Sequence, residues 1–254
     1  MQLWTATHAK TLLPALLVMI VIGIILRLTI GKKSLKIRMI PLQIVAVLLV
    51  ILEIGKQYVS FTRGYDLYHI PLHYCSLFIF AVPAMAFYTG KGCEKVRAAG
   101  AGFCAAMALL LLIYPVLIYG DWNIRGFFKD YLDMHTVAFH NLVLFAFVLC
   151  LALDLYVPES KREQSAPVLA TAAFCVISAS AANLMKVNYA NFYQCNIPPL
   201  EAVRVAVQNA AGYVPAQILY VCIVSALTVL FTWGAYWLYC LIRKGTAIKT
   251  PVTQ

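Results

Sequence analysis

The chain has 254 residues, of which 63% are hydrophobic and only 12% are charged, and its formal net charge is +10. With a mean hydropathy of +0.82, this composition excludes a water-soluble globular protein and indicates a membrane protein with several spans. The positive charge does not indicate a nucleic-acid-binding protein. The Lys and Arg residues cluster beside apolar runs, where they set orientation and contact anionic lipid headgroups.

Seven apolar runs come close to the ~20 residues that a helix needs to cross a bilayer. They are residues 12–30, 40–61, 70–88, 98–120, 137–157, 168–187 and 216–242. We therefore expect an all-α, polytopic membrane protein with one domain, residues 1–254, folded as a seven-transmembrane helix bundle. In the longest connection, Pro199 is expected to start a further helix that lies on the membrane or dips into it.

The Lys and Arg residues of the short loops predict the orientation of the bundle. Twelve of them follow the first, third, fifth and seventh runs, against six on the opposite side. Positive loops face the cytoplasm, so we expect the N-terminus outside and the C-terminus inside. The chain also contains eight cysteines, most of them inside apolar runs and none in a C-x-x-C pair. These are typical of small buried side chains, and we expect no metal and no cofactor.

With this orientation, the polar and ionisable residues inside the spans fall at a similar depth near the outer ends of their helices. They are Glu53, Lys56, His73, Cys75, Tyr114, His135, His140 and Asn183. An ionisable residue inside a membrane is a functional candidate by default. The sequence therefore predicts one polar chamber that opens outward, with Asn188 of the connection after the sixth run as a further supporting residue.

Cys75 is the candidate nucleophile of this chamber. It lies four residues after Pro71, and proline is favoured in the first turn of a helix, so we expect the thiol about 6 Å inside the helix entrance. The unpaired N–H groups of a first turn favour a thiolate. The base must come from another helix, and His140 at a similar depth is preferred. His135 stays an alternative, because five positions turn a helix by about 140° and the sequence does not fix which of the two faces inward.

Purely structural interpretations also apply to these residues. Glu53 and Lys56, three positions apart, can neutralise each other, while Tyr114 and Asn183 can join helices by hydrogen bonds. His135 is expected at the headgroup surface. At the inner ends, Arg27 and Asp154 are expected to reach the membrane interface with their charged groups.

Three short motifs resemble the YwaF-type bacterial membrane proteins, which are related to the eukaryotic transmembrane protein 164. They are Leu72-His73-Tyr74-Cys75, Phe139-His140-Asn141, and the stretch from Asn183 through Asn188 to Tyr189. The likeness covers most of the chain in order and spacing. It departs from the family pattern at Tyr74, where leucine is usual, and at Asn141, where glycine is common.

The resemblance implies a reaction and its residues. The animal members are described as acyltransferases that move a fatty acyl chain between phospholipids with a catalytic cysteine and histidine, which match Cys75 and His140 here. We therefore expect a cell-membrane phospholipid/lysophospholipid acyltransferase, or a lipid acyl hydrolase, acting in the outer leaflet. Its partners would be phospholipids and lysophospholipids, and His73, Tyr114 or Asn183 would donate to the oxyanion.

Two alternatives remain open from the sequence. Glu53, Lys56 and the histidines are also residue types from which a transporter or ion-coupled carrier builds a relay, and uptake into proteoliposomes would support that function. A non-catalytic scaffold or receptor is the other alternative. It would keep its function in a variant that lacks both Cys75 and His140.

Overall fold

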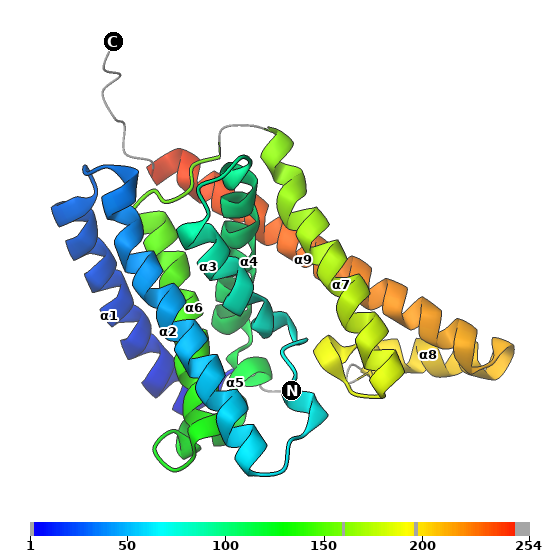
Figure 1. The fold of residues 1–254 in the computed structure, drawn as a ribbon. Helices are drawn as coiled ribbons and strands as arrows, with labels where there is room; N and C mark the ends of the chain where they lie inside the picture. The colour runs from blue at the N-terminus through cyan, green and yellow to red at the C-terminus, as the bar shows by residue number, and fades with distance from the viewer. Residues whose placement is uncertain (1–2, 159–160, 196–197, 247–254) are drawn as a thin grey trace.

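The computed structural model describes residues 3–158, 161–195 and 198–246, and of residues 121–123, 161, 162 and 246 it describes the backbone alone. Every regular element within these ranges is a helix. The α-helices are α1 (Ala6–Ile30), α2 (Leu35–Thr62), α3 (Phe78–Phe87), α4 (Cys93–Ile113), α5 (Pro115–Gly126), α6 (Tyr131–Ala152), α7 (Ser165–Met185), α8 (Pro198–Ala211) and α9 (Tyr213–Thr246) (Figure 1). The short 3₁₀ helices are η1 (Leu67–His69), η2 (Tyr74–Leu77), η3 (Lys161–Gln164) and η4 (Tyr189–Asn191).

Six of the described helices are long and apolar enough to cross a membrane, namely α1, α2, α4, α6, α7 and α9. The seventh predicted span is the shorter apolar helix Tyr74–Phe87, formed by η2 and α3. The all-α, polytopic membrane fold is thus confirmed, and the number of seven spans and the inside–outside orientation stay predictions. The helix expected at Pro199 begins one residue earlier and packs along α9.

The third span does not begin where the sequence indicates. Pro71 lies three residues before the helix, because residues 70–73 form a bent, non-helical segment that ends at His73, the N-cap of η2. The Ser178 hydroxyl of α7 donates a 2.7 Å hydrogen bond to the Leu72 carbonyl and holds this segment in place. Cys75 is therefore the second residue of the helix rather than a residue one turn inside it.

The fourth span is broken where one continuous helix over residues 98–120 was expected. Pro115 has no N–H to donate and disfavours helical geometry in the residue before it. Tyr114 accordingly adopts φ −140° and ψ 65°, so that α4 ends at Ile113 and α5 begins at Pro115. The break turns α5 against α6 and α1, where it lines the interior of the bundle.

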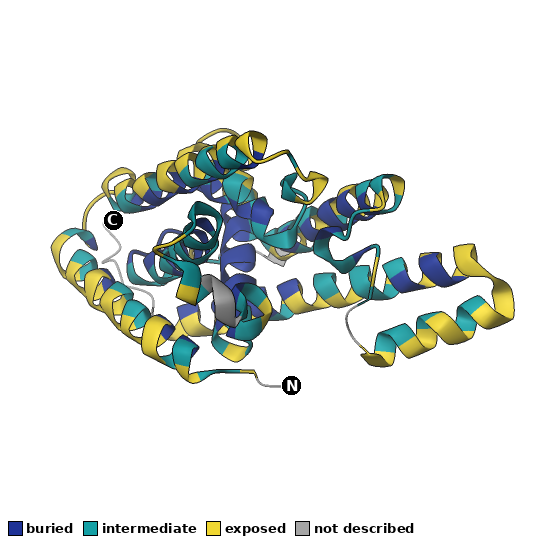
Figure 2. Ribbon diagram, turned by 90° about the horizontal axis from the view of Figure 1, so that it is seen from below, coloured by how far each residue is buried: buried dark blue, intermediate teal, exposed yellow. Residues whose placement is uncertain are grey.

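Helix α4 lies at the centre of the bundle and contacts α3, α5, α6, α7 and α9. Small residues make this possible, because helices in lipid approach each other most closely at glycine and alanine. A Cβ at Gly102 would come within 2.9 Å of Pro167 Cβ, so this position has no room for a side chain. The main core surrounds α4 (Figure 2).

A second, smaller apolar core lies to one side of the bundle. It joins α7, η4 and α9 around Phe174, Tyr189 and Phe192. Tyr74 and Leu77 of η2 pack against both cores, so the segment that carries Cys75 lies at their junction. Helix α8 extends away from the bundle beside the first part of α9 (Figure 1).

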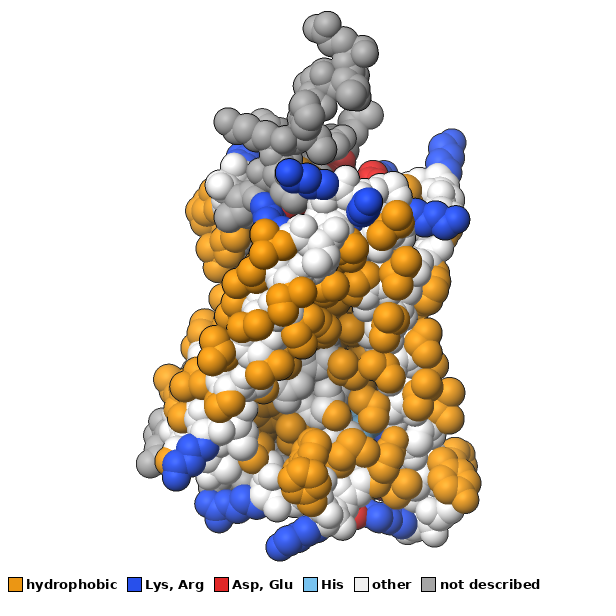
Figure 3. Space-filling model, turned by 90° about the vertical axis from the view of Figure 1, so that its left-hand side faces the viewer, with side chains coloured by type: hydrophobic (Ala, Val, Ile, Leu, Met, Phe, Trp, Pro, Cys, Tyr) orange, Lys and Arg blue, Asp and Glu red, His pale blue; other side chains and the backbone are white. Residues whose placement is uncertain are grey.

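The outer surface has the pattern of a membrane protein. Apolar side chains cover the middle of the face shown in Figure 3, and Lys and Arg side chains gather at its two ends. Large apolar residues such as Leu28 on α1 and Ile54 on α2 are exposed at 81% and 64%. Lipid tails, which are as apolar as these side chains, account for such exposure.

Three arginines close the C-terminal end of α6, and we refer to Arg27, Arg38 and Arg243 together as the arginine cap. Arg243, which is 1% exposed, forms a buried ion pair with Asp154, and Arg27 lies 3.6 Å from the same carboxylate. Their guanidinium groups also donate to the last carbonyls of the helix, at Leu151 and Ala152 and, from Arg38, at Leu153 and Asp154. Asp154 is 7% exposed, so the expectation that it extends to the interface is wrong: it is the counter-ion of this cap.

Candidate functional site

Glu53 is the centre of a buried polar cluster between α2 and α6. Its carboxylate accepts hydrogen bonds from Lys56 Nζ at 2.9 Å and from Gln57 Nε2 at 2.7 Å. Its second oxygen lies 3.3 Å from His135 Nε2. The carboxylate is only 7% exposed and is compensated by these groups, as a buried charge must be. Spacing on one helix predicts the contact with Lys56, and the contact with His135 is tertiary.

His135 and His140 both face the interior of the bundle, with exposures of 7% and 6%. This is possible because α6 packs against α1, α2, α4 and α5, so that side chains about 140° apart are covered by different neighbours. His135 faces Glu53 on α2, and the ring of His140 meets Tyr119 of α5 edge to face at 5.9 Å. The expected place of His135 at the headgroup surface is therefore wrong.

His140 has the hydrogen-bonding pattern of a base. Its Nδ1 lies 2.6 Å from the Thr136 carbonyl, which can only accept, so Nδ1 carries the proton. The lone pair of the neutral ring is then on Nε2. This atom is buried and has no hydrogen-bond partner among the described residues. The backbone of α6 thus fixes the tautomer that leaves Nε2 available to accept a proton.

Cys75 is half-buried at the start of η2, next to the same polar cluster. Its side chain packs against the main core, and apolar surroundings favour the thiol over a resting thiolate. The hydroxyl of Ser76 and the residue's own N–H lie beside the sulfur. No hydrogen bond between Cys75 and His140 is recorded in this part of the chain.

His73 contacts a separate structural feature, residues 186–195, which we name the α7–α8 clasp. The His73 Nε2–H donates to the Tyr68 carbonyl at 3.0 Å, and Nδ1 accepts from the Ala190 N–H at 3.5 Å. Its ring lies between the rings of Tyr68 and Tyr189. Both ring nitrogens are therefore engaged within the protein, so the donation to an oxyanion expected of His73 is not available in this conformation.

Asn183 and Asn188 also hold the clasp. Asn183 donates to the Phe192 carbonyl at 3.2 Å and accepts from Gln217 at 2.9 Å, and the Asn188 side chain accepts the N–H groups of two clasp residues. The clasp needs these bonds because Lys186, Ala190 and Asn191 have positive φ, a strained conformation for residues other than glycine. The helix-joining interpretation of Asn183 is the one that the contacts support.

Tyr114 lies at the α4–α5 break and is half-buried. Its carbonyl accepts from the Leu117 N–H at 3.1 Å, and no hydrogen bond of its hydroxyl is recorded within the described ranges. The structure thus brings Glu53, Lys56 and His135 into one contact network and engages His73, Asn183 and Asn188 with the clasp. Cys75 and His140 lie on η2 and α6, with no contact between them recorded among the described residues.

Sequence reasoning missed several residues of the cluster. Gln57 donates to the His69 carbonyl at 2.8 Å, Ser60 is hydrogen-bonded to His69 Nδ1, and the Tyr65 hydroxyl donates to Gln57. A signal for the α2 members exists, because Gln57 and Ser60 are four and seven positions after Glu53 and so share its helix face. His69 and Tyr65 lie in a connection whose path the spacing of residues does not determine.

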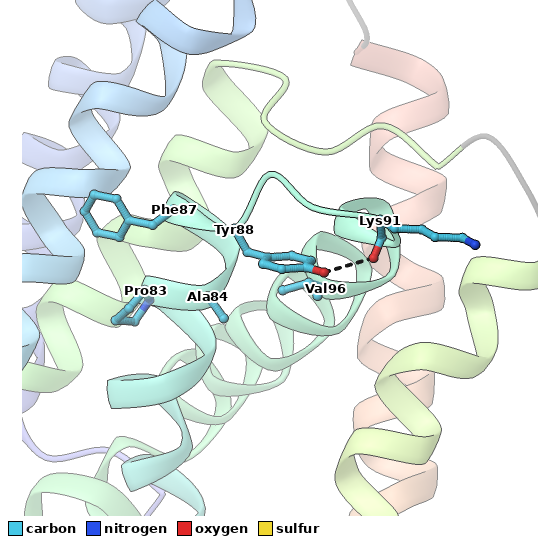
Figure 4. A pocket seen from close by; sticks show the side chains of 6 residues that line it. All are labelled: Pro83, Ala84, Phe87, Tyr88, Lys91 and Val96. Atoms are coloured by element: carbon cyan, nitrogen blue, oxygen red, sulfur yellow. Dashed lines mark hydrogen bonds between the residues drawn. The ribbon is translucent and has the colours of Figure 1, made fainter.

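One apolar groove, with a volume of about 610 Å³, is lined by the C-terminal part of α3 and the start of α4. Figure 4 shows Pro83, Phe87 and Tyr88 on its wall, with the Tyr88 hydroxyl donating to the Lys91 carbonyl. The groove is at the opposite end of α3 from Cys75, so it is separate from the polar cluster.

Comparison with known proteins gives one match. The family described as the TMEM164 family matches residues 3–238, which is nearly the whole chain and includes every residue of the candidate site. No curated protein and no solved structure matches significantly.

Proposed function

The chain belongs to the TMEM164 family of membrane proteins, and from this premise we propose that it is a lipid acyltransferase in which Cys75 is the nucleophile and His140 the base. The observation that carries the proposal is the state of the His140 ring: Nδ1 is fixed on the Thr136 carbonyl, and Nε2 is buried without a hydrogen-bond partner among the described residues. Cys75 comes from η2 and His140 from α6, and the proposed reaction brings the thiol to this nitrogen, directly or through one water.

The first half of the reaction forms an acyl-enzyme. His140 Nε2 takes the thiol proton of Cys75, directly or through one water, and the sulfur attacks the ester carbonyl of a phospholipid. The tetrahedral intermediate collapses with cleavage of the ester C–O bond, and the lysophospholipid oxygen leaves with the proton from His140. The products are a thioester on Cys75 and a lysophospholipid.

Backbone donors at the start of η2 suit the developing oxyanion. The first hydrogen bond of this helix runs from the Ser76 N–H to the His73 carbonyl, so the N–H groups before it have no acceptor inside the helix. Such groups stabilise negative charge at a helix start. They take over the role for which the sequence suggested His73 and Asn183, since those side chains are committed to the clasp.

The second half transfers the acyl chain. The hydroxyl of a second lysophospholipid gives its proton to His140 Nε2 and attacks the thioester, which restores the thiol of Cys75 and produces a new diacyl lipid. Water in place of the lysophospholipid gives a free fatty acid, which is the hydrolase form of the same chemistry. We propose the cell membrane as the location, with phospholipids and lysophospholipids as the partners.

The test uses the purified chain in vesicles with a phospholipid labelled in its acyl chain, with and without lysophospholipid. We expect a hydroxylamine-sensitive label on the protein and, with lysophospholipid, a new labelled diacyl lipid. Cys75→Ser should remove the hydroxylamine-sensitive adduct, and Cys222→Ser, at an exposed position on α9, should keep it. Unchanged transfer by a Cys75→Ala, His140→Ala double variant would overturn the assignment of the two residues, and a parent that forms neither the adduct nor the new lipid would overturn the proposal and favour a scaffold.

A further inference from the structure

Three deeply buried polar atoms from three different helices have no hydrogen-bond partner among the residues that the structure describes. They are His8 Nε2 of α1, Tyr119 Oη of α5 and His140 Nε2 of α6. The exposures of these residues are 0%, 1% and 6%. His8 and Tyr119 take no part in the reaction proposed above, and neither was a candidate from the sequence.

Tyr119 lies next to both histidines. Its ring centroid is 6.3 Å from that of His8, with the rings nearly parallel, and 5.9 Å from that of His140, with the rings perpendicular. The second nitrogen of each imidazole is bound within its own helix: His8 Nδ1 lies 2.7 Å from Thr5 Oγ1, and His140 Nδ1 lies 2.6 Å from the Thr136 carbonyl. The bond at Nδ1 therefore fixes the orientation of each ring, and Nε2 on the opposite side has no hydrogen-bond partner among the described residues.

The hydrogen-bonding roles of the three atoms are complementary. His8 Nδ1 accepts the Thr5 N–H at 3.3 Å, so in the neutral ring Nε2 carries the proton and is a donor. His140 has the opposite tautomer, so its Nε2 is an acceptor. The Tyr119 ring is adjacent to both imidazoles, and its hydroxyl both donates and accepts. A chain of hydrogen bonds can therefore run in one direction from His8 through Tyr119 to His140.

Leaving all three atoms unpaired would be costly. Each unsatisfied buried polar group costs about 1–3 kcal/mol, and native proteins contain few of them. Buried water typically makes about three hydrogen bonds to such groups. The combination of one donor, one acceptor and one hydroxyl around a shared aromatic ring is a polar site of the kind that water occupies.

We propose that His8, Tyr119 and His140 bind ordered water between them and that Tyr119, through this water, is a positioning residue for the His140 imidazole. The water site itself is independent of the reaction, whereas the positioning role rests on the proposed function. In that role the hydrogen bonds from His8 through Tyr119 keep the lone pair of the His140 ring on Nε2, where it receives the proton of the Cys75 thiol. The same hydrogen bonds also connect His140 to the first turn of α1, which lies at the same end of the bundle as the start of α6.

The sign of a stability change tests the water site. Tyr119→Phe removes a hydroxyl that has no hydrogen-bond partner among the described residues, so in a dry site the variant is as stable as the parent or more stable. With water bound, the variant loses a hydrogen bond, and we expect a lower thermal midpoint in lipid nanodiscs. Tyr239→Phe calibrates the assay, because its buried hydroxyl donates to the Tyr156 carbonyl at 2.6 Å in another part of the bundle. An unchanged or raised midpoint for Tyr119→Phe overturns the proposal.

Nitrogen NMR of ¹⁵N-histidine-labelled protein tests the positioning role without any need for activity. The Nε2 signal of His140, identified by its loss in His140→Gln, should shift in Tyr119→Phe and stay in place in Tyr239→Phe. The rate of acyl-adduct formation on Cys75 should fall about tenfold in Tyr119→Phe, with little change in KM. If the parent forms no adduct, the proposed function fails, and the thermal and NMR results still decide on the water site. An unmoved Nε2 signal refutes the positioning role.

Discussion

The two ends of α6 differ in how their buried polar groups are compensated. At the C-terminal end, the arginine cap supplies donors to four successive carbonyls and surrounds the carboxylate of Asp154. At the N-terminal end, Glu53 compensates Lys56 and His135, and one turn further along His140 keeps an unpartnered nitrogen. Both ends contain buried charges, and among the described residues of α6 the buried imidazole nitrogens without a hydrogen-bond partner, on His135 and His140, lie toward the N-terminal end.

The difference separates charge that holds helices together from charge that performs chemistry. The arginine cap connects α1, α2 and α9 to one helix end, and its groups are already engaged with one another. A buried base without a protein partner has a cost in stability and is retained where the group is used. We therefore assign structure to the C-terminal end of α6 and function to its N-terminal end, and the following variants test that assignment.

The largest expected effect is on the structural end. Asp154→Asn keeps a residue that tolerates the positive φ of 51° and removes the charge that compensates Arg243. Breaking a buried ion pair on one side costs about 3–5 kcal/mol, and we expect a loss of stability of that size, measured by unfolding in detergent micelles. Arg27→Gln is the graded control, since Arg27 is one-third exposed and 3.6 Å from Asp154, and should cost less. Equal stabilities for Asp154→Asn and the parent would remove the structural assignment.

At the functional end, the two histidines should respond differently. His140→Gln should lower the rate of acyl-adduct formation by about 10²–10⁴-fold while the protein stays folded, because the lost Nε2 has no protein partner. His135→Gln should mainly reduce stability, by about 1–3 kcal/mol, because it removes a group that compensates Glu53. Adduct kinetics and thermal unfolding of both variants give the comparison. The opposite pattern would make His135 the base.

Variants of the clasp should show a third kind of response, a loss of stability that is confined to the clasp. Gln217 donates to Asn183 at 2.9 Å and to two clasp carbonyls at 3.1 and 3.2 Å. Gln217→Leu removes the donor to the Asn183 side chain and to the Tyr193 carbonyl, at a cost of about 1–3 kcal/mol, while the Phe192 carbonyl keeps its bond from Asn183. Hydrogen exchange should accelerate in residues 186–195 and not at the arginine cap. Gln43→Leu is the matched control, because Gln43 makes a single recorded bond, to the Ala86 carbonyl.

The smallest effect is a pH dependence at the entrance to α6. Asp130 caps this helix and pairs with Arg63 at 2.6 Å, and that hydrogen bond lowers the pKa of the carboxyl below its ordinary value of 3.8. A carboxyl group whose pKa is lower in the folded than in the unfolded protein stabilises the fold at pH values above the unfolded-state pKa. This stabilisation is lost as the pH falls through the folded-state pKa. Asp130→Asn should therefore be slightly less stable than the parent at pH 7, by up to about 1 kcal/mol for so exposed a pair, and equal to it in strong acid. A difference that persists in strong acid would contradict the assignment to Asp130.

Much of the fold could be predicted from hydropathy alone, because each long span must satisfy its backbone internally and must be apolar over most of its length. The breaks were harder. Pro115 does mark the end of α4, and its effect on Tyr114 is a local rule that could have been applied. The late start of η2 could not be predicted in the same way. The Ser178 hydroxyl holds residues 70–73 in place, and Ser178 is 106 positions away from Leu72 in the sequence.

The site shows the same division between local and tertiary information. Spacing on α2 predicts the ion pair of Glu53 and Lys56, while the contact with His135 depends on how α2 and α6 pack. The burial of His135 was misjudged. Helical geometry gives the angle between the side chains of His135 and His140, but it does not say how many neighbouring helices surround α6. Asn183 and Asn188 were predicted as part of the chamber because the clasp that engages them has no signature in the spacing of residues.

The shortness of the helix Tyr74–Phe87 has a consequence for the lipid around it. Four 3₁₀ and ten α-helical residues rise about 23 Å, less than the ~30 Å thickness of the hydrocarbon layer. A bilayer thins beside a hydrophobic segment that is too short for it. Such a dimple would draw glycerol esters toward the mouth of the third span, and thicker membranes would hold them away.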